Sequence, residues 1–279
     1  MVFPSFIGIG AQRSGSTWLH LLLKQHPKIY MPEKRKEIHF FDQNYHKGLE
    51  WYESFFPDKQ SAINYQAIGE ITPEYLNISE CAERIACLTS VQKLIVILRN
   101  PVNRVYSQYS HSVRLSNYQK SFEEYILEHP YAIKRGFYAE QLEHYLKLFD
   151  KNQICCLIFE ESVNNVDLTK QKLAQFLDIE FDKFPDSVGL EKVNQTYLPK
   201  FKKLNYISFY VRNKLVDKDL NWLVNIVKTL RFQKVLEYGA KYTLPTMSIE
   251  TKLRLENIFK QDIERLEKLL DINLDIWRS

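Results

Sequence analysis

The sequence predicts a three-layer α/β fold in which helices flank a central parallel sheet. Short apolar runs alternate with segments of helical spacing over the first part of the chain, the order of elements that builds right-handed crossovers between parallel strands. The run Lys-Leu-Ile-Val-Ile-Leu at 93–98 is almost wholly apolar, as expected of a strand buried on both faces. We therefore expect one domain over residues 1–279, with an α/β core at about 3–178 and a helical C-terminal part at about 180–279.

The first elements enclose a loop that contains glycine. A strand is expected at the apolar run 3–9, and residues 16–25 then carry apolar side chains at helical spacing. A second strand is expected at 28–31, where Pro32 ends it. Residues 33–45 are charged and aromatic and follow no clean period.

The rest of the core repeats the alternation. Further strands are expected at the apolar runs 67–70, 93–98 and 154–159. Helices are expected where apolar residues recur every three or four positions, at 48–56, 79–88, 102–115, 121–128, 138–149 and 167–177. The strand at 93–98 stops at Arg99-Asn100-Pro101, because proline favours the first turn of a helix.

The C-terminal part carries an uneven charge. Helices are expected at 202–216, 219–230 and 248–270, the last with a broad apolar face. Residues 192–241 hold eleven Lys or Arg against three Asp or Glu, although the whole chain has a net charge of only +4. Such a basic face fits an anionic substrate, a nucleotide, a membrane surface or simply a solvated helix, so the charge alone leaves its role open.

Composition excludes several classes of protein. With 45% hydrophobic and 26% charged residues, the chain is neither disordered nor collagen-like. The small net charge gives no reason to expect a nucleic-acid partner. No apolar run is long enough to span a membrane and no leader pattern begins the chain, so we expect a cytoplasmic protein. The four cysteines show no ligand spacing, so no metal is expected, and nothing indicates an oligomeric state.

The loop Gly10-Ala11-Gln12-Arg13-Ser14-Gly15-Ser16-Thr17 follows the first strand and opens a helix. Its outline is that of the nucleoside-triphosphate loop G-x-x-x-x-G-K-[ST]. Ser16 stands where that motif has the lysine that reaches the β- and γ-phosphates, and the basic residue here is Arg13. Backbone N–H groups, the helix N-terminus and the hydroxyls of Ser16 and Thr17 can still hold an anion.

A second element of the enzymes that bind nucleoside triphosphates, the Mg²⁺-binding aspartate, is also absent. Their later strand ends in an aspartate that holds Mg²⁺, whereas the strongest strand here ends in Arg99. An arginine at that place is a second anion receptor. The two strand ends therefore predict a ligand with two anionic groups, bound without a metal.

These residues resemble the sulfotransferases that use 3′-phosphoadenosine-5′-phosphosulfate (PAPS). The run Arg13-Ser14-Gly15-Ser16-Thr17-Trp18 resembles the family's 5′-phosphosulfate loop, in which many members have lysine where this chain has Arg13. Arg99, with Ser107 eight positions later, resembles the pair that holds the 3′-phosphate. The resemblance implies a phosphate-loop-like α/β fold, with PAPS as co-substrate held by Arg13, Ser14, Gly15, Ser16, Thr17, Trp18, Arg99 and Ser107.

Two further blocks resemble the carbohydrate branch of that family, notably the heparan sulfate sulfotransferases, and a third resembles a block of the family as a whole. The run Lys36-Glu37-Ile38-His39-Phe40-Phe41-Asp42 implies that Glu37 is the base toward the acceptor, with His39 and Asp42 lining the same site. The run from Gly69 to Tyr75 resembles the next block, except that Ile71 stands where the branch usually has lysine. Gly136-Phe137-Tyr138 with Gln141 resembles a block near the acceptor, which places Tyr138 among the substrate-binding residues.

We therefore expect an enzyme that transfers the sulfuryl group of PAPS to a hydroxyl or amine, the acceptor being a carbohydrate or glycoconjugate. Its catalytic residues would be Glu37, His39 and Arg13. Two alternatives stay open from the residues. One is a nucleotide-dependent phosphotransferase with a degenerate loop, and the other is a protein that binds a phosphonucleotide or anionic glycan without turnover.

Overall fold

The computed structural model describes residues 1–116, 118–186, 189 and 246–278. The helices predicted at 202–216 and 219–230 lie outside these described residues, as does the basic segment 192–241. Their structure and role stay predictions.

The chain falls into two compact units. The first comprises Met1–Arg104, Lys134–Val193 and Glu256–Ser279, and the second comprises Val105–Ile133 and Asn194–Leu255. The strands all belong to the first unit, so far as the described residues go. Whether residues 1–279 form the single domain expected from the sequence stays a prediction.

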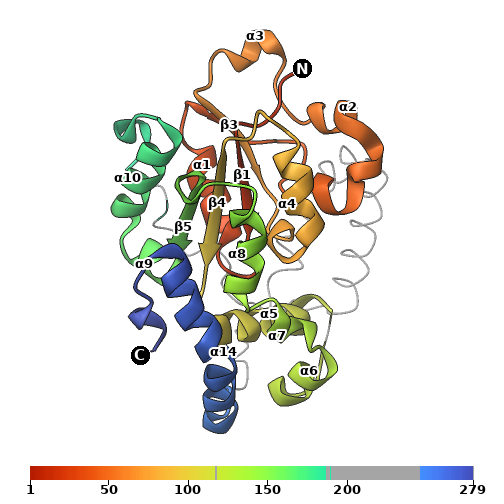
Figure 1. Ribbon diagram of the computed structural model, residues 1–279, viewed down its shortest axis with the longest axis vertical. Coiled ribbons are helices and arrows are strands. Elements are labelled where there is room, and N and C mark those ends of the chain that lie inside the picture. Colours follow the sequence, from red (N-terminus) through yellow and green to blue (C-terminus); the bar gives the residue numbers. More distant parts are fainter. Residues whose placement is uncertain (117, 187–188, 190–245, 279) are drawn as a thin grey trace, which may run out of the picture. The chain divides into compact units, whose positions relative to one another are not determined.

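A five-stranded parallel sheet forms the centre of the first unit (Figure 1). Its strands are β1 (Phe6–Gly10), β2 (Ile29–Tyr30), β3 (Ala67–Ile71), β4 (Lys93–Leu98) and β5 (Ile154–Ile158). They lie in the order β2-β3-β1-β4-β5, so the chain adds strands first on one side of β1 and then on the other. Open parallel sheets bind ligands outside the carboxyl ends of the strands at such a reversal.

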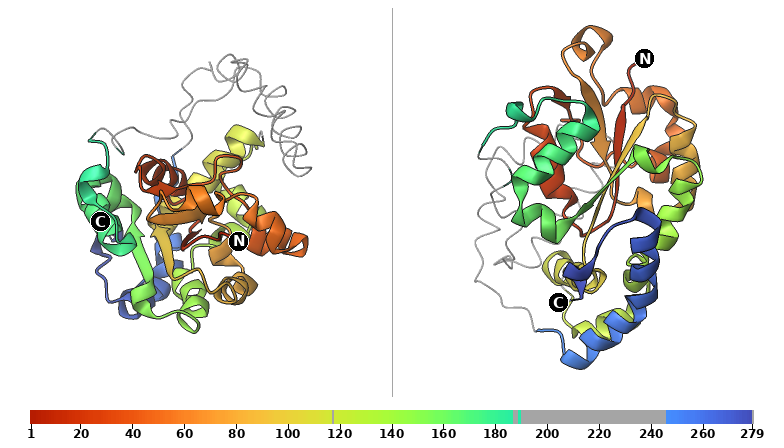
Figure 2. Two further views of the ribbon diagram at one scale, coloured as in Figure 1. Left: turned by 90° about the horizontal axis from the view of Figure 1, so that it is seen from above. Right: turned by 60° about the vertical axis from the view of Figure 1, so that its left-hand side comes forward.

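Helices cover both faces of this sheet (Figure 2). On one face, α1 (Ser16–Lys24) and α10 (Val166–Leu177) share a continuous apolar core with the strands. On the other lie α4 (Ser79–Ala86) and α8 (Tyr138–Leu146), which contact each other. Every residue of β1 and β5 is buried, which explains why these strands have continuous apolar sequences. The predicted three-layer α/β architecture is confirmed.

The other described helices are α2 (Gly48–Glu53), α3 (Lys59–Ala62), α5 (Pro101–Leu115), α6 (Phe122–Glu128), α7 (Tyr131–Lys134), α9 (Phe159–Asn164) and α14 (Ile249–Leu270). Single turns are η1 (Phe40–Asn44), which is π-helical, and the 3-10 turns η2 (Tyr45–Lys47), η3 (Tyr75–Asn77), η4 (Lys151–Gln153), η5 (Phe181–Lys183) and η6 (Asp275–Trp277). Apolar spacing did not predict α3, α7 and α9, because helices of four to six residues are too short to show a period. The strand predicted at 154–159 ends at Ile158, because Phe159 begins α9.

The described part of the second unit contains most of α5 and all of α6. A capping box begins α6: the N–H of Glu124 donates to the hydroxyl of Ser121 at 3.1 Å, and the N–H of Ser121 donates to the Glu124 carboxylate at 3.0 Å. The ring of Tyr109 lies 5.5 Å from the rings of both Phe122 and Tyr125. These contacts join the two helices within this unit.

Among the described residues, no helix combines the length and the apolar character needed to cross a bilayer. Helix α14 has 22 residues, but charged side chains recur along it. The cytoplasmic location expected from the sequence stays a prediction.

Candidate active site

The loop between β1 and α1 has the shape of an anion-binding turn. Arg13 and Gly15 have positive φ angles of 67° and 100°, and these left-handed residues lead the chain into the helix. A Cβ on residue 15 would lie 2.4 Å from the ring of Phe159, so glycine is required there. The N–H of Ala11 donates to the carbonyl of Ile97 at 2.8 Å, which fixes the loop to β4.

The first turn of α1 provides backbone donors to this site. Leu19 makes the first bond of the helix, from its N–H to the carbonyl of Gly15 at 3.0 Å. The N–H groups of Ser16, Thr17 and Trp18 therefore precede the helical ladder. Donors in this position, together with the helix dipole, bind phosphate and sulfate oxygens.

Two residues predicted to bind the nucleotide support the loop from inside. The indole of Trp18 is 5% exposed and donates its Nε1–H to the carbonyl of Gly189 at 3.0 Å. Ser14 is fully buried, and its N–H donates to the carbonyl of Ala11 at 3.3 Å. The indole of Trp18 packs in the apolar core, so Trp18 has only its backbone N–H to offer a ligand. The buried hydroxyl of Ser14 has no hydrogen-bond partner among the described residues.

A chain of polar contacts joins this loop to the residues expected to act on the acceptor. Nζ of Lys36 donates to Oγ1 of Thr17 at 2.7 Å and to Oε1 of Glu37 at 3.0 Å. The other carboxylate oxygen of Glu37 lies 3.6 Å from Nε2 of His39, and Nδ1 of His39 lies 2.7 Å from Oδ2 of Asp42. The structure thus brings Glu37, His39 and Asp42 together beside the loop.

These neighbours set the charges of the cluster. Burial alone would raise the pKa of Glu37, but the neighbouring His39 and the charge of Lys36 outweigh it and lower that pKa to about 2. Burial would lower the pKa of His39, but its bonds to Asp42 and Glu37 raise it to about 9. At neutral pH the cluster therefore holds a Glu37 carboxylate beside a His39 imidazolium.

The bend of the chain at His39 places Asp42 against its ring. His39 has a φ of 56°, and its carbonyl accepts the N–H of Asn44 at 2.9 Å, which closes the π-helical turn η1. Nδ2 of Asn44 donates to the same carbonyl at 2.8 Å. Residues 33–45 show no regular period in the sequence because this turn depends on such specific bonds and not on repeated apolar spacing.

A buried carboxylate on β3 holds this bend, and the sequence assigned it no role. Glu70 is fully buried and accepts hydrogen bonds from the hydroxyls of Thr72 at 2.7 Å and Tyr75 at 2.8 Å. Those hydroxyl oxygens accept the backbone N–H groups of His39 at 3.4 Å and Phe40 at 2.9 Å. Burial raises the pKa of Glu70 to about 7, although the hydrogen bonds from the two hydroxyls act to lower it. A polar residue inside an apolar strand was the signal available in the sequence.

Ile71 packs in the core, at the position where the carbohydrate branch usually has lysine. It is 1% exposed, and a Cβ added to Gly8 of the neighbouring strand would lie 2.5 Å from its side chain. A lysine ammonium could not be placed there without leaving the core. In this chain Lys36 and His39 are cations beside Glu37.

Arg99 begins the turn after β4. Its guanidinium lies 5.1 Å from the centre of the Phe159 ring, and its Nε is buried with no hydrogen-bond partner among the described residues. Burial lowers the pKa of Arg99, although the negative charge of Glu160 acts to raise it. The side chain of Asn100 accepts the N–H groups of Val102 at 3.0 Å and Asn103 at 3.1 Å, which caps α5. A buried donor without a partner is suited to receive an anion.

Tyr138, expected among the substrate-binding residues, has a fully buried side chain, and its hydroxyl donates to the carbonyl of Arg99 at 2.9 Å. Its role toward an acceptor stays a prediction. Burial raises the pKa of Tyr138 to about 12. Tyr138 therefore fixes the backbone at the end of β4.

Ser107 lies on α5 in the second unit, so its pairing with Arg99 stays a prediction.

Arg135 is a further residue at the loop that the sequence did not indicate. It forms an ion pair with Glu74 and a hydrogen bond with the side-chain oxygen of Gln12. Gln12 in turn donates to Glu74 at 3.1 Å. This network ties the loop to the segment that follows β3.

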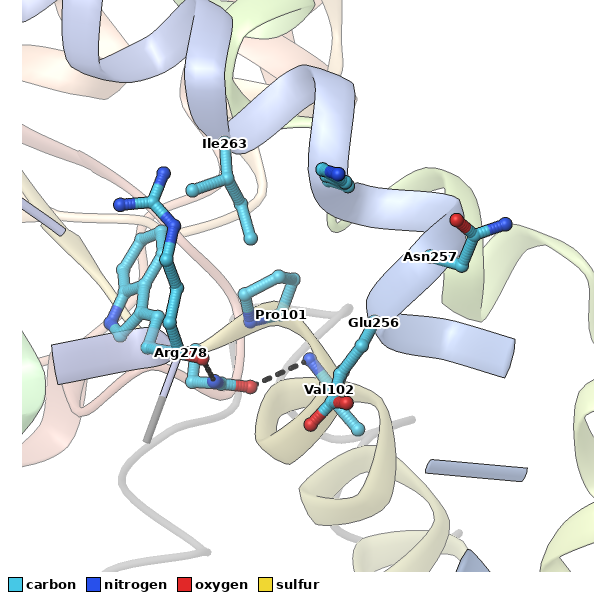
Figure 3. Close-up of a pocket in the computed structure, with 9 residues that line it drawn as sticks. Pro101, Val102, Glu256, Asn257, Ile263 and Arg278 are labelled. Atoms are coloured by element: carbon cyan, nitrogen blue, oxygen red, sulfur yellow. Dashed lines mark hydrogen bonds between the residues drawn. The ribbon is translucent and has the colours of Figure 1, made fainter. Parts of the chain in front are cut away.

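A cavity of about 330 Å³ lies beside the start of α5 (Figure 3). Asn100 forms part of its wall and donates to the carbonyl of Trp277 at 2.9 Å. The other lining residues are Pro101, Val102, Glu256, Asn257, Lys260, Ile263, Trp277 and Arg278. None of the site residues expected from the sequence lines it.

Comparison with known proteins identifies the family. The sulfotransferase domain family matches residues 4–263. The chain belongs to the sulfotransferase family. A sulfotransferase from Alicyclobacillus acidocaldarius has a similar structure, with a TM-score of 0.68 and 23% identity over the whole of both chains. The family and the phosphate-loop-like fold predicted from the sequence are therefore confirmed.

Curated relatives include enzymes of heparan sulfate. The bifunctional heparan sulfate N-deacetylase/N-sulfotransferase 4 of Mus musculus is 38% identical over 48% of this chain and 15% of its own length. The heparan sulfate glucosamine 3-O-sulfotransferase 6 of Homo sapiens is 32% identical over 53% of this chain and 44% of its own. The membrane-associated sulfotransferase kil1 of Dictyostelium discoideum is 41% identical over 46% of this chain and 27% of its own. The chain thus matches less than half the length of each of these relatives.

Proposed function

We propose that the protein transfers the sulfuryl group of PAPS to a hydroxyl or amine of a carbohydrate or glycoconjugate. The observation that carries this proposal is the contact chain from Thr17 through Lys36 to Glu37 and His39. It supports the proposal because it joins the carboxylate of Glu37, which would be the base, to the first turn of α1, whose N–H groups can hold an anion.

The residues present fit the two anionic groups of PAPS. The N–H groups at the start of α1, with Arg13, would hold the phosphosulfate, since both kinds of donor suit its oxygens. The buried Nε of Arg99 would receive the 3′-phosphate, with Ser107 as its predicted partner. The two strand ends are neighbours, because β1 and β4 pair directly in the sheet.

The chemistry asks for a proton acceptor and for charge stabilisation. Glu37 would take the proton of the attacking hydroxyl or amine while the acceptor's oxygen or nitrogen bonds to sulfur. The bond from sulfur to the phosphate oxygen breaks, and that oxygen keeps the electron pair. Arg13 and the N–H groups of α1 would stabilise the negative charge that develops there. His39, held by Asp42, would orient Glu37 by facing the carboxylate oxygen that Lys36 does not bind.

The class of acceptor rests on the relatives and on one block of sequence. The relatives named for heparan sulfate are 32–38% identical over about half of the chain, and the run from Lys36 to Asp42 lies within the resemblance to their branch. Ile71 departs from that branch, which argues for an acceptor less highly charged than heparan sulfate.

Transfer of ³⁵S from labelled PAPS tests the proposal. The purified protein would be incubated with oligosaccharides, simple alcohols and amines, and the labelled product separated. We expect label on at least one carbohydrate acceptor and stoichiometric release of adenosine 3′,5′-bisphosphate. Binding of PAPS without transfer to any acceptor would favour the binding-protein alternative. Binding of ATP that requires Mg²⁺ would favour the phosphotransferase.

A further inference from the structure

Lys36 occupies the junction between the loop and the base, and neither the resemblance nor the proposed function assigns it a role. Its Nζ lies 2.7 Å from Oγ1 of Thr17 and 3.0 Å from Oε1 of Glu37. The side chain is 30% exposed and that of Glu37 is 36% exposed. The junction is therefore open to a ligand from the solvent side.

The ammonium group is placed to accept a third partner. A lysine has three N–H donors, and among the described residues Thr17 and Glu37 account for two of them. Thr17 belongs to the first turn of α1, whose N–H groups face outward from the helix end. An anion bound at that turn would bring a charged oxygen close to Nζ.

We propose that Lys36 contacts the sulfuryl group while it passes from PAPS to the acceptor. This inference rests on the proposed function and names a further residue of the same site. Lys36 stands between the donor loop and the acceptor base, so its charge would neutralise the sulfuryl oxygens at the point where transfer takes place.

The contact would also free the base. In the structure Glu37 is bound by Lys36 on one oxygen and faces His39 on the other, and these partners lower its pKa to about 2. A carboxylate held so firmly accepts protons poorly. When Nζ turns to the sulfuryl oxygens, Glu37 loses one hydrogen bond, and its pKa rises toward the ordinary value. Glu37 would then become a stronger base only when the donor is present.

When Nζ of Lys36 exchanges Glu37 for the sulfuryl oxygens, the other charged groups nearby do not take part. His39 is held by Asp42 on the far side of Glu37. Arg35 donates its Nε–H to the carbonyl of Glu37 at 2.8 Å. His20, on α1, is a further titratable neighbour, and burial followed by the charge of Lys36 lowers its pKa to about 4. His20 is therefore neutral at pH 7 and does not compete for an anion.

Calorimetry with two nucleotides separates this role from support of the loop. Adenosine 3′,5′-bisphosphate lacks the sulfuryl group, and PAPS carries it. For Lys36→Gln, without acceptor, we expect PAPS affinity to fall about 10–100-fold, as for a lost charge-assisted hydrogen bond. Bisphosphate affinity should change less than about twofold, and Lys36→Arg should recover part of the PAPS affinity. Lys34, whose Nζ donates to the carbonyl of Ser54 at 2.9 Å, gives the control Lys34→Gln, which should bind both nucleotides normally.

The pH profile of turnover gives a second readout. If Lys36 only kept Glu37 ionised, the loss in Lys36→Gln would vanish above about pH 6, because an ordinary glutamate is ionised there. Contact with the sulfuryl group predicts a loss that persists from pH 6 to 9. Equal weakening of both nucleotides, or unchanged PAPS affinity, would overturn the inference. Wild-type protein that binds neither nucleotide would overturn the proposed function itself, which is a different result.

Discussion

The two strand ends that the site uses are built in opposite ways. At the end of β4, the carbonyl of Arg99 is held by the buried hydroxyl of Tyr138, and the N–H of Asn100 donates to Glu160 at 3.0 Å. At the end of β1, the loop is joined to a network of charged side chains in which Lys36 and Glu37 are each about one-third exposed. The first arrangement is fixed by buried bonds to the backbone. The second can exchange its partners.

This difference indicates that the end of β4 holds the nucleotide and that the end of β1 supports the transfer step. A rigid, partly buried guanidinium is suited to hold a phosphate that does not react, because little conformational freedom is lost on binding. A partly exposed set of charged groups can give up one hydrogen bond and take another as charge moves during transfer. We therefore expect changes at β4 to alter affinity and changes near Glu37 to alter turnover.

The largest effect is expected for Glu37→Gln, which keeps the shape of the side chain and removes the proton acceptor. Turnover should fall roughly 10²–10⁴-fold, the usual contribution of a general base, while bisphosphate affinity stays near normal. Glu33→Gln, an exposed neighbour, is the matched control. Steady-state kinetics together with calorimetry measure both quantities. Near-normal turnover would move the base to His39, and lost nucleotide binding would make Glu37 a support of the loop.

Arg99→Ala should weaken bisphosphate binding about 10–100-fold, as for a lost charge-assisted bond. Adenosine 5′-phosphosulfate lacks the 3′-phosphate, so its affinity should change little. Calorimetry with both nucleotides measures the difference. Arg265→Ala removes an exposed ion pair with Glu143 and should leave both affinities unchanged. If Arg99→Ala weakens the two nucleotides equally, Arg99 does not hold the 3′-phosphate.

Glu70→Gln should lower the free energy of unfolding by about 1–3 kcal/mol, because its amide NH₂ cannot accept the hydroxyl donors that a carboxylate accepts. The bend at His39 depends on those hydroxyls, so turnover should also fall, whereas donor affinity should not. Urea unfolding and kinetics measure these effects. The exposed Glu83→Gln serves as control. A variant with normal stability and normal turnover would show that Glu70 does not hold the bend.

The smallest effect is a pH dependence of stability. The pKa of His39 is raised to about 9 in the folded protein, above the ordinary value near 6.5, so its contribution is fully present below about pH 6.5 and is lost as the pH rises through 9. Wild-type protein should lose more stability than His39→Gln between pH 6.5 and 9.5 in urea titrations. An identical loss in both proteins would mean that the imidazolium is not bound in the folded state.

The sequence predicted the features that depend on local pattern. The strand at Lys93–Leu98 was placed to the residue, because a strand buried on both faces has an unbroken apolar sequence. The family also came from short, ordered motifs. The roles of Tyr138 and Glu70 did not. Tyr138 binds the carbonyl of Arg99, which is distant in the sequence, and Glu70 supports the distant His39 only through the hydroxyl of Thr72. The motif named Trp18 among the nucleotide-binding residues without indicating that its side chain would be buried.

The central claim is that the two strand ends hold the two ends of one nucleotide, with Glu37 beside the sulfuryl position. A crystal structure with adenosine 3′,5′-bisphosphate tests this most directly. We expect the 5′-phosphate on the N–H groups of Ser16, Thr17 and Trp18, and the 3′-phosphate on the guanidinium of Arg99. Nζ of Lys36 should face the space beyond the 5′-phosphate, where the sulfuryl group of PAPS would lie. A nucleotide bound elsewhere, or with its 3′-phosphate away from Arg99, would contradict the account.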